Sequence, residues 1–173
     1  LKGVVGCRCA ILGKPNTNSR AGHLWQRPQP GPDPRNLLLT HWQYIRRADS
    51  PPALMPCDVS QGGCYAFTEE TYRRLGGFGE TRGFYGFIDR DLGIRCRFLD
   101  IPLRVCTRVT SSHLFRGPRP YLQSGVWWYW GYAECLRSMF RPETWRSVFL
   151  PPLQPIRERL QDPMLEFLCE APY

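Results

Sequence analysis

Lysine is almost absent from this sequence: Lys2 and Lys14 are the only two, although Lys and Arg together number 23 in 173 residues. The formal net charge of +8 is therefore carried by arginine, which suits planar contacts with phosphate or carboxylate groups. The sequence has no run of five or six basic residues. We therefore expect no nucleic-acid partner, and a basic nucleic-acid-binding protein is the least favoured alternative.

The eight cysteines include no Cys-x-x-Cys pair, and this absence is evidence against a structural zinc site. Their even number leaves disulfides open, but most of them lie within apolar segments. We expect thiols in a reducing compartment. Cys9, Cys64, Cys96 and Cys106 are predicted to be small buried hydrophobic residues.

Long apolar runs and a signal peptide are also absent. The longest apolar stretches fall well short of the roughly 20 residues that a membrane-spanning helix needs. The first residue is Leu1, without the basic start and cleavage site of a signal peptide, so we expect the sequence to begin at a cut. The cytoplasm or the cytoplasmic face of a membrane is favoured over secretion, and association with a membrane surface is kept open.

Strand and loop patterns dominate the first half of the sequence. Residues 3–12 are apolar and β-branched at their start, which predicts a buried strand. Residues 13–36 are rich in Pro, Asn and Gly and predict a long loop. Residues 37–45 suit a helix or a strand. The alternation in residues 103–109 predicts a half-buried strand.

Two helices are predicted between these strands. Thr68 is a good N-cap with two glutamates after it, and either Gly76 or Gly77 suits a left-handed C-cap. A second helix begins near Ile88, where apolar residues recur at helical spacing. Asp91 and Arg95 are four residues apart, the spacing of an ion pair along a helix.

The composition changes near residue 120. We predict a compact domain over residues 1–120 and an aromatic- and proline-rich helical tail over residues 121–173. The tail contains three tryptophans, Trp127, Trp128 and Trp130. They suit two roles: an exposed patch that contacts sugars or a membrane interface, and the packing of a tail helix against the core. The packing role is favoured.

Three motifs occur in order over about 55 residues: GGCYAFTEETYRRLGGF at 62–78, GFYGFIDRDLGIR at 83–95 and CTRVTSSHLFR at 106–116. Together they resemble the C-terminal half of a nucleotide-sugar-dependent glycosyltransferase of the GT-A fold. The likeness is to family 2 enzymes and to galactosyl- and N-acetylgalactosaminyl-transferases. In these enzymes a GG-x-x-A segment precedes a helix that ends in GGF, an acidic helix start follows, and a His-x-Phe-Arg segment comes one strand later.

The resemblance implies an α/β fold, the C-terminal half of a GT-A domain with a short helical tail. It implies transfer of a sugar from a nucleotide-diphosphate donor, with a UDP-sugar favoured, to an acceptor hydroxyl. The acceptor is a carbohydrate, a protein or a lipid, and the implied cofactor is Mn²⁺ or Mg²⁺.

The resemblance also assigns chemistry to single residues. Asp89 occupies the position of the general base, where a carboxylate takes the acceptor's proton. Asp91 is assigned to a sugar hydroxyl or to Arg95. His113 matches the histidine that ligates the metal in some relatives. The alternatives are that the two aspartates only cap a helix and that His113 is structural.

Five further residues are assigned to substrate binding. Gly62 and Gly63 resemble the paired glycines of the sugar pocket, and a plain tight turn is the alternative. Tyr85 and Gly86 lie where the family has an aromatic residue and a glycine beside the acceptor, unless they belong to a loop without function. Arg116 follows His113 in the expected phosphate neighbourhood.

Two departures from the family pattern bear on activity. Ile88 stands where the family usually has Glu, which favours the alternative of a non-catalytic binding module with a degenerate transferase fold. The Asp-x-Asp motif that binds metal and donor does not occur before Gly62. We therefore expect a fragment without the nucleotide-binding half, inactive alone, in which residues 3–12 leave an unpaired strand edge.

Overall fold

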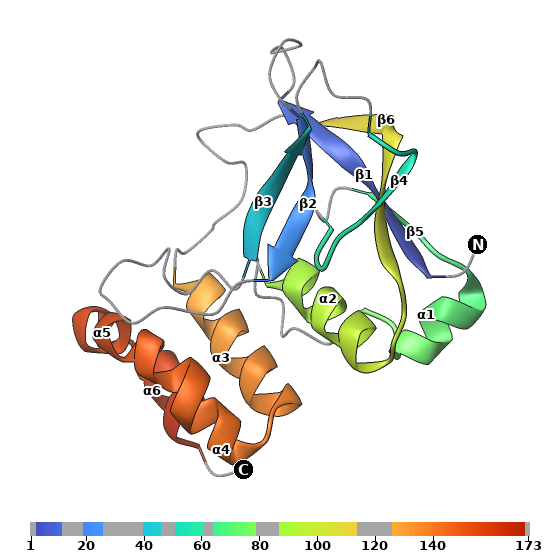
Figure 1. Ribbon diagram of the computed structural model, residues 1–173. Coiled ribbons are helices and arrows are strands. Elements are labelled where there is room, and N and C mark those ends of the chain that lie inside the picture. Colours follow the sequence, from blue (N-terminus) through green and yellow to red (C-terminus); the bar gives the residue numbers. More distant parts are fainter. Residues whose placement is uncertain are drawn as a thin grey trace. The chain divides into compact units, whose positions relative to one another are not determined.

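The structure is a computed structural model that describes residues 3–11, 19–25, 40–45, 51–60, 64–78, 87–113 and 126–171. The strands are β1 Val4–Ile11, β2 Ser19–Trp25, β3 Thr40–Ile45, β4 Leu54–Pro56, β5 Tyr65–Ala66 and β6 Leu103–His113. The helices are α1 Glu69–Leu75, α2 Ile88–Phe98, α3 Trp127–Met139, α4 Pro142–Thr144, α5 Leu150–Leu160 and α6 Pro163–Glu170, with a π-helical turn at Trp145–Phe149. The predicted α/β class is confirmed at this level (Figure 1).

The chain divides into two compact units. The first contains the sheet together with α1 and α2. The second contains α3 to α6, and Phe87 belongs to it. No helix in the described ranges is long and apolar enough to cross a membrane.

The sheet of the first unit is built around β1. Its main strand order is β3-β2-β1-β6-β4, and β5 also pairs with β1 (Figure 1). β6 runs parallel to β1 along one edge, and β2 and β5 pair antiparallel with the other. The predicted strand at residues 3–12 is confirmed. The expectation that it leaves an unpaired edge is wrong, because both of its edges have partners.

The prediction of a long loop over residues 13–36 is wrong in its middle, where β2 lies. The segment SRAGHLW has little local strand preference, but it pairs antiparallel with β3 from Ser19↔Ile45 to Trp25↔Thr40, with a register shift between Arg20 and Gly22. Cross-strand pairing rather than intrinsic preference decides such a segment. The same pairing makes a strand of residues 40–45, a region where the sequence left helix and strand open.

α1 has the two ends that its sequence predicts. The side chain of Thr68 accepts a hydrogen bond from the backbone N–H of Thr71 at 3.1 Å. Gly76 ends the helix with φ 74°, a left-handed conformation that glycine adopts without steric cost. These local signals place the Gly76–Phe78 turn directly after α1.

α2 is joined to that turn by Arg95. Its guanidinium donates to the carbonyl oxygens of Leu75 at 2.7 Å and Gly77 at 2.5 Å, and to the carboxylate of Asp91 at 2.5 Å. The predicted Asp91–Arg95 pair is thus confirmed, with both side chains largely buried. One side chain therefore connects the start of α2 to the end of α1.

β6 alternates as predicted only over its first part. Leu103, Val105 and Thr107 are buried, but Val109 is 54% exposed. The pairing with β1 moves from Cys106 directly to Thr110 on the β6 side, so the intervening residues bulge out of register. A bulge changes which face a side chain occupies, and this accounts for Val109.

The core of the first unit lies where β1, β6, α1 and α2 meet. Its fully buried members include Val4 and Val105, and Leu92 and Cys96 of α2 pack in the same cluster. The predicted apolar stripe of α2 therefore faces the core at these two positions, but its first member, Ile88, is 37% exposed.

Aromatic packing and the carboxylate of Asp162 are among the contacts that hold the second unit together. Phe87 makes edge-to-face contacts with Trp128 at 5.7 Å and Tyr132 at 5.8 Å. Asp162 caps α6 through the N–H of Leu165 and also accepts from the indole N–H of Trp130, both at 2.8 Å. Trp128 and Trp130 therefore serve packing within this unit.

Replacement of Arg95 by Ala should lower the free energy of unfolding by about 3 kcal/mol, since it leaves the buried Asp91 carboxylate without this guanidinium. Urea denaturation followed by circular dichroism measures the change. Arg73→Ala is the matched control. Arg73 pairs with Glu69 one helical turn earlier, and the side chains of the two residues are 78% and 75% exposed. Such exposed pairs contribute about 0.5 kcal/mol or less to stability. Equal losses in the two variants would contradict the anchoring role of Arg95.

Candidate functional site

The described part of the chain includes three of the predicted site residues. Asp89 and Asp91 lie in the first turn of α2, and His113 ends β6 with its backbone paired to Ile11. The other predictions fall outside the described residues: Gly62, Gly63, Tyr85, Gly86 and Arg116. The candidate site is therefore built around the start of α2.

Asp89 is held by a tyrosine from another element. The hydroxyl of Tyr65 in β5 lies 3.0 Å from the Asp89 Oδ1 and also 3.0 Å from the carbonyl oxygen of Ser60. Burial, followed by the negative charge of Asp89, raises the pKa of Tyr65 well above its usual value. Tyr65 thus remains a protonated donor that orients the half-buried Asp89 carboxylate.

Sequence reasoning did not assign Tyr65 to the site. It lies in the GGCYAF segment, but its partner is 24 residues away, and no local spacing predicts such a contact. The available signal was a tyrosine in a short apolar segment, because a buried phenol usually needs a hydrogen-bond partner.

Arg90 adds positive charge beside Asp89. Burial lowers the pKa of its guanidinium, and the neighbouring Asp89 carboxylate opposes that change. Arginine stays protonated in proteins because its intrinsic pKa is so high. The site therefore combines a carboxylate, a phenol and a guanidinium.

Gly6 of β1 lies tightly against the side chain of Ser60, whose carbonyl oxygen is the second partner of Tyr65. A Cβ atom on Gly6 would lie 1.7 Å from the Ser60 Oγ and 2.8 Å from its Cβ. Ser60 is 1% exposed, and its hydroxyl has no hydrogen-bond partner among the described residues. β1 thus lies directly against the segment that leads to Gly62, at a position where only glycine fits.

Asp91 has a structural partner. It is 4% exposed and forms the short ion pair with Arg95 described above. The sequence left two partners open for Asp91, a sugar hydroxyl and Arg95, and the structure shows the pair with Arg95. A contact between Asp91 and a sugar hydroxyl stays a prediction.

No group of three or more His, Cys, Asp or Glu side chains suited to a metal ion occurs among the residues that the structure describes. Asp89 and Asp91 do not form one, because Asp91 faces Arg95. The assignment of His113 to a metal stays a prediction from the resemblance.

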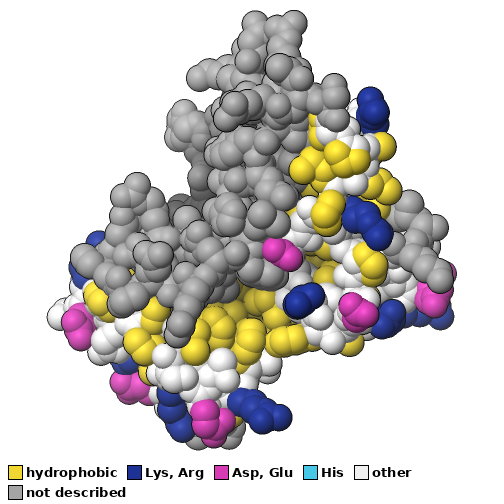
Figure 2. All heavy atoms as spheres, in the orientation of Figure 1, with side chains coloured by type: hydrophobic (Ala, Val, Ile, Leu, Met, Phe, Trp, Pro, Cys, Tyr) yellow, Lys and Arg dark blue, Asp and Glu magenta, His cyan; other side chains and the backbone are white. Residues whose placement is uncertain are grey.

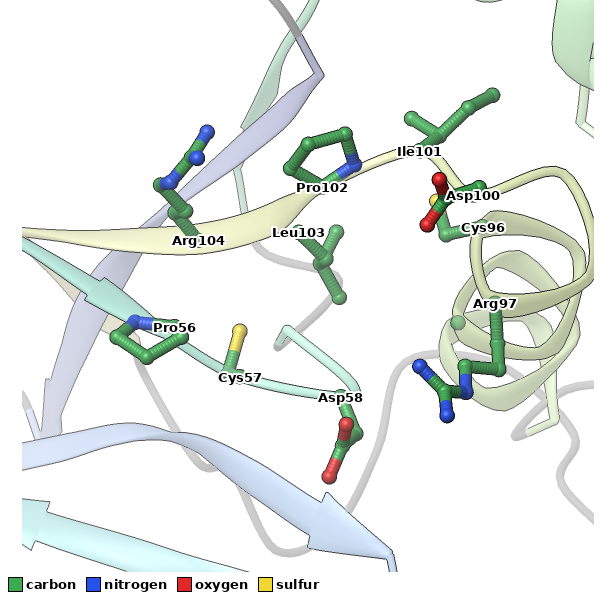
Figure 3. Close-up of a pocket in the computed structure, with 11 residues that line it drawn as sticks. Pro56, Cys57, Asp58, Cys96, Arg97, Asp100, Ile101, Pro102, Leu103 and Arg104 are labelled. Atoms are coloured by element: carbon green, nitrogen blue, oxygen red, sulfur yellow. The ribbon is translucent and has the colours of Figure 1, made fainter.

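A separate cavity of about 280 Å³ lies between the end of β4, the second half of α2 and the start of β6. Cys57 and Leu103 point toward each other in it, and Cys96 also lines it (Figure 3). Burial raises the pKa of Cys57 to about 12 and that of Cys96 to about 11. Both thiols are protonated at neutral pH, so neither suits nucleophilic chemistry.

The prediction that four cysteines are small buried hydrophobic residues holds only in part. Cys96 is 2% exposed, but Cys106 is intermediate and Cys64 is exposed. Cys64 immediately precedes β5, which has only two residues and provides little cover. The six cysteines whose side chains are described all carry thiols, while Cys7 and Cys9 lie in the part of β1 where side chains are not described.

Charge on the described surface is mixed. Figure 2 shows both arginine side chains and Asp and Glu side chains on the described surface of this face.

No protein-family model matches this sequence, and no curated protein matches it either.

Alkylation by iodoacetamide at pH 7.5 should modify Cys64 well before Cys57 and Cys96. The reactive species is the thiolate, and the raised pKa values of the two buried thiols keep their thiolate fractions very small. Peptide mapping by mass spectrometry after timed labelling measures the order. The Cys64→Ser variant is the control and should lose one of the early-labelled cysteines. Labelling of Cys57 at the rate of Cys64 would contradict the prediction and show that the cavity is open to the reagent.

Proposed function

We propose that this chain is the acceptor-side part of a metal-dependent glycosyltransferase of the GT-A fold. It moves a sugar from a nucleotide-diphosphate donor, with a UDP-sugar favoured, to an acceptor hydroxyl. The observation that carries the proposal is Asp89, a half-buried carboxylate at a helix start, oriented by Tyr65 at 3.0 Å. It lies within the motif that resembles the acidic helix start of these enzymes.

The chemistry assigned to the described residues is proton removal. Asp89 accepts the proton of the acceptor hydroxyl as that oxygen bonds to the anomeric carbon and the bond to the diphosphate breaks. The hydrogen bond from Tyr65 limits rotation of the carboxylate, and the guanidinium of Arg90 adds positive charge beside it. These three side chains suit a positioned general base.

Neutralising the diphosphate requires groups beyond these residues. Mn²⁺ or Mg²⁺ would stabilise the charge on the leaving group, and among the residues of this chain the resemblance assigns His113 to the metal. Such cations prefer several oxygen ligands, which one imidazole does not replace. The donor-binding Asp-x-Asp is therefore expected from another region or another chain.

Ile88 supports a second candidate, a binding module that has lost catalysis. It is 37% exposed at the position where the family usually has Glu, so an acidic group is replaced by an apolar surface. In this case the chain binds a carbohydrate without transferring a sugar.

Asp89→Asn preserves the shape of the side chain and removes the base. In the full-length protein it should lower the turnover number about 10²- to 10⁴-fold, with little change in the affinity for the donor. Steady-state transfer assays and donor titrations measure the two quantities. Asp100→Asn is the control, since Asp100 is exposed and follows the opposite end of α2. Parental turnover in Asp89→Asn would remove Asp89 from the mechanism.

The 173-residue chain by itself should show no micromolar, Mn²⁺-dependent binding of UDP-sugars. Its sequence has no Asp-x-Asp before Gly62, and a single histidine is a poor site for a hard cation. Isothermal titration calorimetry with and without Mn²⁺ tests this. Metal-dependent micromolar binding would mean that the donor site lies within this chain.

A further inference from the structure

Four aromatic rings form one cluster next to Asp89. Phe67 and Tyr72 stack with ring centroids 5.5 Å apart and planes inclined by 7°. Phe78 meets both rings edge-on at 5.8 Å. Tyr65 lies 6.5 Å from Phe78 and is the residue whose hydroxyl holds Asp89. The cluster is therefore continuous with the proposed catalytic base.

The cluster is anchored at one side and exposed at the other. Tyr65 and Phe67 are partly buried and pack on the core of the first unit. Tyr72 is 39% exposed and Phe78 is 43% exposed. The two exposed rings are thus held in place by two rings that are more deeply buried.

The glycine turn keeps this arrangement close-packed. Gly77 has φ 79°, and a Cβ atom there would lie 3.2 Å from the hydroxyl of Tyr72. Arg95 holds the carbonyl oxygen of the same glycine. The N–H of Gly77 donates to the carbonyl oxygen of Tyr72 at 3.0 Å. Hydrogen bonds at both backbone groups of Gly77 thus hold the chain between Tyr72 and Phe78, so the exposed rings are preorganised for a ligand.

We propose that Tyr72 and Phe78, which we call the acceptor platform, bind a carbohydrate acceptor by stacking against the C–H face of a sugar ring. This inference rests on the proposed transferase function, because it places the acceptor beside Asp89. A pyranose has one apolar face and a rim of hydroxyl groups. In this proposal the two rings contact the apolar face. Polar groups for the hydroxyl groups come from the exposed Glu69–Arg73 pair of α1 and from Asp89, which Tyr65 of the same cluster holds.

The same features favour a carbohydrate over the other two acceptor classes. A lipid chain needs a continuous apolar groove, whereas two half-exposed rings bordered by charged side chains offer only a short apolar surface. A peptide acceptor would gain most from backbone hydrogen bonds along a strand edge, and the platform lies on a helix and its following turn. The platform therefore specifies a sugar with an accessible C–H face.

NMR titration of the 173-residue chain with lactose, cellobiose and chitobiose tests the binding step. At least one of these disaccharides should shift resonances of α1 and of the following turn. Tyr72→Leu and Phe78→Leu keep apolar packing but remove the aromatic face, and each should weaken that binding about tenfold, equal to about 1.4 kcal/mol. Tyr72→Phe should retain it. Phe98→Leu is the matched control, because Phe98 is 56% exposed but lies outside the cluster.

A second measurement separates this inference from the proposed function. In the full-length protein, Tyr72→Leu and Phe78→Leu should reduce transfer to the sugar acceptor while hydrolysis of the donor continues. Unchanged transfer in both variants, or a parent chain that binds none of the three disaccharides, would overturn the acceptor platform. Absence of donor turnover in the parent protein, with sugar binding that still depends on Tyr72 and Phe78, would overturn the transferase function and leave the sugar site standing.

Discussion

The guanidinium of Arg95 is the contact on which the first unit's site depends. It joins the carboxylate of Asp91 to two carbonyl oxygens at the end of α1, so the first turn of α2 and the turn after α1 are fixed together. Asp89 lies in that first turn, and Phe78 follows the glycine turn. One buried side chain thus sets the position of the proposed base and of the aromatic rings beside it, although it takes part in neither.

The elements that could be predicted from the sequence are those that local chemistry decides. Thr68 and Gly76 identify the ends of α1 because capping depends on neighbouring residues only. The Asp91–Arg95 pair follows from helical spacing. The strand at residues 103–109 follows from alternation, and the buried positions match it as far as Thr107. Regular pairing with β1 ends one residue earlier, at Cys106.

The rest depends on contacts between distant residues. β2 becomes a strand through pairing with β3 and β1, which its composition does not indicate. The Tyr65–Asp89 bond joins residues that no periodicity relates. Val109 is exposed because a bulge interrupts β6, and a bulge depends on the partner strand. In the candidate site, therefore, the sequence indicated the carboxylate, whereas the residue that holds it became apparent only from the fold.

The contact between Gly6 and Ser60 has a consequence for sequence variation in this protein. A side chain at position 6 requires the space that the Ser60 Oγ and Cβ occupy, so neither residue is free to change alone toward a larger one. Related sequences with alanine at position 6 should therefore carry glycine at position 60, and the two positions should vary as a pair. Such covariation would connect β1 to the segment before Gly62 across 54 residues of chain.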